Sequence, residues 1–168
     1  NRMNRIEDKV DGISNRMTEI ELQISSNLIP TQGIFFDGQV FDAYEFVSKI
    51  IRSAKRNIVL IDNYTDETTL THLSKKKKGV NVLILTKNIS KQLQLDIKKA
   101  NEQYGPFELR TFTKSHDRFL IVDRTEVYHL GASLKDLGKK WFAFSKMDSW
   151  AAEVINKIKT NIPSSFQS

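Results

Sequence analysis

A histidine, a cation and an acid stand at fixed spacing in one short stretch of this sequence. His116 and Arg118 are two residues apart, an apolar run leads from them to Asp123, and the turn Gly131-Ala132-Ser133 follows. A guanidinium can bind phosphate oxygens bidentately, and a turn of small residues can add amide or hydroxyl donors. The stretch therefore predicts a site that binds a phosphate group.

The other titratable residues near this stretch have more than one interpretation. Asp123 either orients a histidine or ends its strand with a turn, since Asp is common in turns. We expect Asp117, next to His116, to act on it as a local charge and to have no further role. We expect His129 to be a strand residue with a satisfied imidazole and His72 to lie on a helix surface.

The region around the stretch alternates between helical and extended patterns. The apolar spacing predicts helices over 39–54, from Thr65 to the lysine block 75–78, over 90–104 and over 149–160, and strands over 58–61, 80–85, 107–112 and 141–145. A tight turn at 123–125 separates 119–122 from 126–130 as a hairpin, and 134–138 forms a short helix or turn. Trp141, Phe142 and Phe144 are either core residues or a platform for stacking bases, and we expect them in the core. Such alternation predicts an α/β fold with a mixed, mostly parallel sheet covered by helices on both faces.

The N-terminal residues carry a different pattern. Apolar side chains recur at alternating intervals of three and four residues, at Met3, Ile6, Val10, Ile13, Met17, Ile20 and Ile24. This heptad seam favours helix-on-helix pairing over packing of the helix on its own domain. We predict a coiled-coil dimerisation helix over 1–28, a linker over 29–38, the α/β domain over 39–163 and a tail over 164–168.

Composition narrows the choice of partners. The 168-residue chain has a formal net charge of +6, which favours an anionic partner such as nucleic acid or another phosphodiester. It has no cysteine, and its three histidines lack zinc spacing, so we expect neither a metal nor a cofactor. No apolar run is long enough to span a bilayer and no signal peptide is visible, so we expect a cytoplasmic protein that does not bind membranes.

The residues from His116 to Asp123 resemble the signature of the phospholipase D superfamily. That signature is His-x-Lys, four residues, Asp, and about six residues later Gly-Ser-x-Asn. Here Arg118 takes the place of the lysine, and Gly131-Ala132-Ser133 falls one residue late with no asparagine. The resemblance implies a phospholipase D-like repeat in which His116 attacks phosphorus without a metal and Arg118 binds the non-bridging oxygens. It also implies phosphate contacts from Ser133 and Lys135.

The same resemblance raises the question of a second copy. Members of the superfamily use two motifs, one histidine attacking and the other protonating the leaving group, whereas this chain has one. A homodimer formed through residues 3–24 could bring two His116 side chains together. The heptad pattern and the amino-acid sequences of 116–118 and 131–140 also resemble the C-terminal region of phage DNA-binding proteins of the ORF6N or KilA-N type. Two functions follow: a metal-independent phosphodiesterase acting on nucleic acid, or a non-catalytic phosphate-binding and dimerisation module of a DNA-binding regulator.

Overall fold

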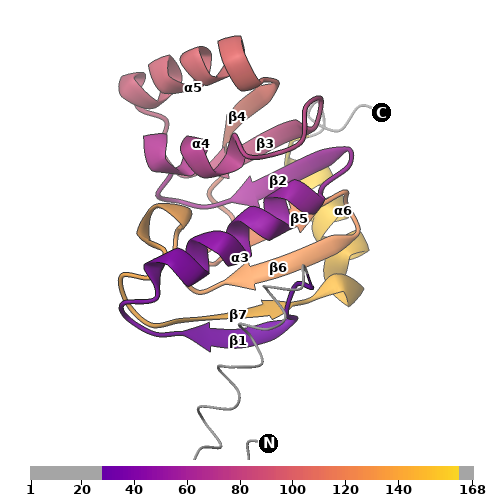
Figure 1. Ribbon diagram of the computed structural model, residues 1–168. Coiled ribbons are helices and arrows are strands. Elements are labelled where there is room, and N and C mark those ends of the chain that lie inside the picture. The colour runs from indigo at the N-terminus through magenta and orange to yellow at the C-terminus, as the bar shows by residue number, and fades with distance from the viewer. Residues whose placement is uncertain (1–27, 163–168) are drawn as a thin grey trace, which may run out of the picture.

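A computed structural model of the protein describes residues 28–162, which form a seven-stranded sheet with helices on both faces (Figure 1). The elements in chain order are β1 (Gln32–Phe35), α3 (Val40–Ser53), β2 (Asn57–Ile61), α4 (Glu67–Leu73), β3 (Asn81–Thr86), α5 (Lys91–Tyr104), β4 (Phe107–Thr111), β5 (Arg118–Val122), β6 (Glu126–Leu130), β7 (Phe142–Lys146) and α6 (Ala151–Asn161). Short 3₁₀ turns, η1 (Leu134–Asp136) and η2 (Asp148–Trp150), flank β7. The helix–strand alternation predicted from the sequence is confirmed.

The sheet order is β1-β7-β6-β5-β2-β3-β4, and it corrects the prediction of a mostly parallel sheet. Among residues 28–162, only β2–β3 and β3–β4 pair in parallel, while the other four strand pairs are antiparallel. The reason is that the β5–β6 hairpin inserts beside β2 instead of extending the sheet past β4. Its three-residue loop, 123–125, suits the twist of a hairpin, because Asp123 and Arg124 have φ of 52° and 61°.

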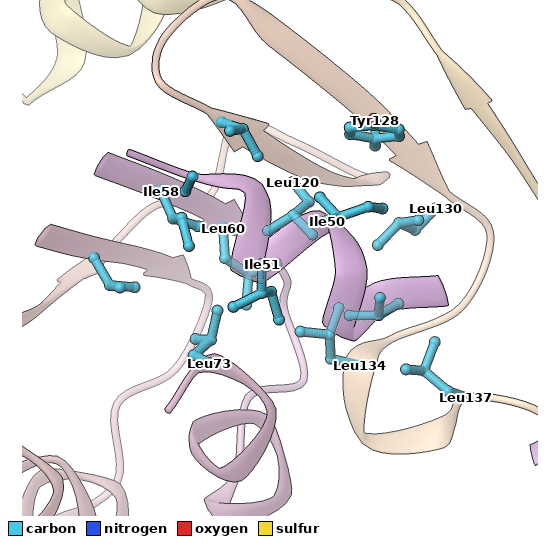
Figure 2. Packing of buried hydrophobic residues seen from close by; sticks show 14 of the residues in the cluster. Ile50, Ile51, Ile58, Leu60, Leu73, Leu120, Tyr128, Leu130, Leu134 and Leu137 are labelled. Atoms are coloured by element: carbon cyan, nitrogen blue, oxygen red, sulfur yellow. The ribbon is translucent and has the colours of Figure 1, made fainter. Parts of the chain in front are cut away.

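Two apolar clusters hold the layers together. On one face of the sheet, α3, α4 and the start of α5 cover a large cluster that includes Phe46, Ile50 and Ile84. On the other face, α6 packs through Ile155 and Ile158 on residues of β2, β3 and β5. Figure 2 shows that Leu134 and Leu137, from the loop between β6 and β7, reach into the first cluster. This packing fixes the loop that carries Ser133.

Several local predictions need correction. The stretch predicted as a linker, 29–38, contains β1, which pairs with β7 at the sheet edge. The helix predicted from Thr65 to the lysine block is shorter: α4 spans Glu67–Leu73 and is capped by Asp66, whose carboxylate accepts from the amides of Thr68 and Thr69. The predicted coiled coil over 3–24 lies outside the described residues, as does the tail.

The environment of His72 was also mispredicted. His72 is buried, packs edge-on against Tyr44 with ring centroids 4.6 Å apart, and has no hydrogen-bond partner for either ring nitrogen among residues 28–162. Burial lowers its pKa to about 4, and the nearby charge of Lys75 acts in the same direction. His72 is therefore a neutral core residue on the buried side of α4.

Candidate site at the carboxyl end of the central strands

The predicted phosphate-site residues gather at one end of the sheet. It is the end towards which β1, β2 and β6 point, at the left of Figure 1, and from which β5 and β7 start. Ile61 at the end of β2 pairs with Phe119, and Arg118 at the start of β5 pairs with Leu130 at the end of β6. The residues just before β5 and just after β2 and β6 therefore lie together. They lie outside the carboxyl ends of β2 and β6, and α/β sheets bind ligands at this kind of position.

His116 lies in a loop that is anchored on both sides of it, through the backbone of Ser115 and the side chain of Asp117. The Asn63 side chain donates to the carbonyl of Ser115 at 3.1 Å, and the carboxylate of Asp117 lies 3.3 Å from Nε2 of His129. The His116 imidazole itself is exposed and makes no hydrogen bond, ion pair or ring contact with any of residues 28–162. Its anchors and its exposure leave this side chain accessible to a ligand from solution.

Arg118 joins the start of β5 to the end of β6. Its Nε donates to the carbonyl of Leu130 at 3.2 Å, and one Nη donates to the carbonyl of Gly131 at 2.8 Å. Both acceptors are neutral, and Arg118 forms no ion pair with an acid in the part of the chain that the structure describes. Its positive charge at this end of the sheet is therefore held in place without being neutralised.

Ser133 lies in this region but is already engaged. Its hydroxyl donates to the two carboxylate oxygens of Asp62 at 2.9 and 2.8 Å, and both residues are buried. The Asp62 carboxylate also accepts from the amides of Tyr64 and Leu134, each at 3.0 Å. Asp62 thus clamps the loop after β6 to the end of β2. Sequence reasoning missed it, although an acid directly after the buried run 58–61 was a usable signal.

Lys135 lies two residues further and is paired with Asp136. Its Nζ is 3.0 Å from Oδ2 of Asp136, and this hydrogen bond raises the pKa of the lysine, with smaller contributions from Asp66 and Asp62. A phosphate would have to compete with these carboxylates for the ammonium group. Of the two predicted phosphate ligands after β6, Ser133 has its hydroxyl hydrogen committed to Asp62, whereas Lys135 keeps further ammonium donors but has its charge paired with Asp136.

Asp123 is separated from these residues by the length of β5. At about 3.3 Å per residue it lies roughly 20 Å from His116. Its carboxylate accepts from three successive amides, those of Lys55, Arg56 and Asn57, at 2.7 to 3.1 Å. Burial alone would raise its pKa, but these bonds lower it. Of the two interpretations of Asp123, the structure matches a turn residue that ends its strand. Asp123 therefore does not belong to the site around His116.

Residues 28–162 contain no group of three or more His, Asp or Glu side chains placed to hold a metal ion. No helix within the same range has both the length and the apolar character that crossing a membrane would demand.

Solved structures share this mixed α/β fold, which is phospholipase D-like. The chain aligns with NucT from Helicobacter pylori at a TM-score of 0.52 and 16% identity, over 77% of this chain and 91% of that one. It aligns with polyphosphate kinase from Porphyromonas gingivalis at a TM-score of 0.54 and 6% identity, over 77% of this chain and 23% of that one.

TrmBL2, an archaeal chromatin protein with a novel mode of DNA binding, aligns at a TM-score of 0.51 and 16% identity, over 95% of this chain and 64% of TrmBL2. At such identities the likeness concerns the fold alone. No protein-family model matches the sequence, and no curated protein matches it.

Proposed function

We propose that this chain is a phosphodiester-binding domain of a nucleic-acid-associated protein and that a phosphate group of the ligand binds at His116 and Arg118. The observation that carries the proposal is the pairing of an exposed imidazole with a guanidinium that no described acid neutralises, at the carboxyl end of a phospholipase D-like sheet. A phosphate diester carries one negative charge and two non-bridging oxygens, which match the donors of Arg118. The formal net charge of +6 favours such a ligand over a neutral one.

The catalytic form of this proposal is a metal-independent phosphodiesterase. His116 would attack phosphorus to give a phosphohistidine and release the leaving group, and water would then cleave the phosphorus–nitrogen bond. The leaving oxygen needs a proton donor, which the His116 of a second copy would supply. Residues 3–24, with their heptad pattern, are the segment that we propose joins the two copies.

A second candidate function has a specific observation in its favour. The Ser133 hydroxyl is committed to Asp62, and the positive charge of Lys135 is paired with Asp136, so a transition state would have to compete with a carboxylate for each. Arg118 also spends two of its donors on backbone carbonyls. These contacts fit a domain that binds a phosphate group without cleaving it. Such a domain would serve as a phosphate-binding and dimerisation module of a phage-type DNA-binding regulator.

One experiment separates the two functions. The purified chain is incubated in excess chelator with single-stranded DNA, with duplex DNA and with bis(4-nitrophenyl) phosphate, beside His116→Ala. Because the His116 imidazole is exposed and makes no hydrogen bond, ion pair or ring contact with residues 28–162, the variant should keep the urea midpoint of the parent. Chelator-resistant cleavage that disappears in this variant supports the enzyme. Cleavage that persists in it assigns the activity elsewhere and refutes His116 as nucleophile.

Binding is tested separately, so that an inactive protein still gives an answer. Arg118→Ala is compared with Lys77→Ala, which also removes one positive charge but from the exposed loop before β3, at the opposite end of the sheet. We expect Arg118→Ala to weaken DNA binding and Lys77→Ala to leave it nearly unchanged. Equal effects of the two variants would mean that only net charge matters, and the proposed site would be wrong.

A further inference from the structure

Trp141 was expected in the core, yet it is 67% exposed. It precedes β7 and is held from two sides by residues that follow β1. Its Nε1 donates to a carboxylate oxygen of Asp37 at 2.8 Å, and its ring meets that of Phe36 edge-on, at 4.7 Å and 87°. An indole fixed in this way keeps a large apolar face in water at a cost in free energy. The ring is therefore both oriented and available.

This ring lies at the same end of the sheet as Arg118. Arg118 donates to the carbonyl of Gly131, and the amide of Gly131 donates to the carbonyl of Ala143, two residues after Trp141. Strands are about 4.8 Å apart and rise about 3.3 Å per residue, so the Cα atoms of Trp141 and Arg118 are separated by roughly 14 Å. A nucleic-acid strand carries one phosphate per about 3.4 Å when stacked and covers that span in about four nucleotides, or fewer when extended.

Basic, aromatic and small residues lie near these two points, together with the acids Asp37, Asp117 and Asp136. Lys139 and Lys140 directly precede Trp141 and are exposed, and Lys140 makes no hydrogen bond or ion pair with the described residues. Phe41, in the first turn of α3, is 72% exposed, and its neighbour Val40 lies against Gly138 of the same loop. Gly131, on the path to Arg118, offers no side chain to obstruct a strand.

We infer that Trp141 is a base-stacking platform for single-stranded nucleic acid whose phosphate a few nucleotides away binds at Arg118; this inference rests on the proposed function. Aromatic rings beside a track of cations are how proteins bind single strands without reading sequence, because every base has a π-face. In duplex DNA the bases are already stacked on each other, so the same ring gains little. The platform therefore selects single strands over duplexes.

The chain contains a matched control. Trp150 is its only other tryptophan, is 52% exposed, and lies in η2, which follows the end of β7 far from Trp141; it lines a hollow beside α6 together with Lys114 and Ser115. In Trp150→Phe the remaining fluorescence reports Trp141, and in Trp141→Phe it reports Trp150. We expect oligothymidylate to quench the first variant saturably and to leave the second almost unchanged. Inorganic polyphosphate, which has charge without bases, should compete for binding without quenching.

Affinity gives a second readout. Trp141→Ala should weaken oligothymidylate binding roughly 5- to 150-fold, the range that corresponds to the loss of one stacked base, while Trp150→Ala should not. Duplex binding should change much less, and so should the binding of polyphosphate. Equal losses in the two alanine variants, or no loss in either, would overturn the platform. So would Trp141 fluorescence that responds to protein concentration instead of DNA, because a second copy would then cover the ring.

The platform and the phosphate site can fail independently. If Arg118→Ala leaves all binding intact while Trp141 is still quenched by oligothymidylate, the proposed phosphate site is wrong and the stacking surface stands. If Arg118→Ala weakens binding of polyphosphate and DNA alike but Trp141→Ala weakens neither, the phosphate site stands and the platform is refuted.

Discussion

The clamp between Ser133 and Asp62 leads to a quantitative prediction. Ser133→Ala removes a hydroxyl that donates to both oxygens of a buried carboxylate at 2.8 and 2.9 Å. The change leaves no cavity of consequence, because alanine differs from serine by one atom. Asp62 keeps the amides of Tyr64 and Leu134 as donors, so its charge is not stripped of all partners. The expected cost is therefore that of one hydrogen bond to a charged group.

Such a bond contributes about 1.5–3 kcal/mol when it is buried. For a chain of this size each kcal/mol shifts the melting temperature by about 2–4 °C, so Ser133→Ala should melt roughly 3–12 °C below the parent. The control is Ser115→Ala, which removes an exposed hydroxyl that donates to the carbonyl of Asp117 at 2.8 Å. We expect that variant to change stability by less than about 0.5 kcal/mol.

The assay is urea denaturation of the three proteins near neutral pH, with binding of polyphosphate measured on the same samples. If Ser133 is a structural clamp, stability falls and polyphosphate affinity of the folded protein stays the same. The opposite result, unchanged stability with weakened polyphosphate binding, would refute this reasoning. It would restore Ser133 to the phosphate-contacting role that the family resemblance implies.

Three further changes test other parts of the fold. Burial lowers the pKa of His72 to about 4 from 6.5, so stability should fall as the pH drops from about 6.5 towards 4, and His72→Phe should flatten this slope in urea titrations. Partial burial would raise the pKa of Asp123, but hydrogen bonds from three backbone amides lower it below 3.8. Asp123→Asn should therefore lower the free energy of unfolding by about 1–2 kcal/mol at neutral pH, and the difference from the parent should shrink in strong acid. Gly138 and Gly79 both have positive φ, +78° and +87°, but a Cβ at Gly138 would collide with Val40 whereas one at Gly79 would meet open space. Gly79→Ala should therefore lower the free energy of unfolding by roughly 1–2 kcal/mol, and Gly138→Ala should lower it clearly more in the same urea titrations.

The sequence predicted the local elements well because their signals are local. The unbroken apolar runs of β2 and β3 marked buried strands, and the tight turn at 123–125 marked the β5–β6 hairpin. The neighbour of a strand is a non-local property. Nothing in the residues of β5 specifies that it lies beside β2 instead of β4, and the predicted strand directions were wrong for that reason.

Trp141 shows a different kind of limit. Phe142 and Phe144 are buried towards α3, so the alternation of a strand turns Ala143 to the other face, and both Ala143 and Trp141 are exposed. In a sheet covered throughout, that other face would also be buried. Here the apolar cluster under α6 includes residues of β2, β3, β5 and β6 but none of β1 or β7. The extent of one helix therefore decided the environment of Trp141, and hydrophobicity alone could not reveal it.

The arginine at position 118 separates the two candidate functions most directly. A lysine ammonium places its donors around a single nitrogen and cannot reproduce the planar pair of bonds to Leu130 and Gly131, so Arg118→Lys should loosen the end of β6 and cost about 0.5–1.5 kcal/mol. The same change supplies the residue found at this position in the superfamily signature. If the arginine is an active variant of that site, Arg118→Lys should retain or raise chelator-resistant cleavage in spite of the lower stability. If the site only binds phosphate, the variant should be less stable and no more active, and a gain in turnover would contradict the non-catalytic assignment.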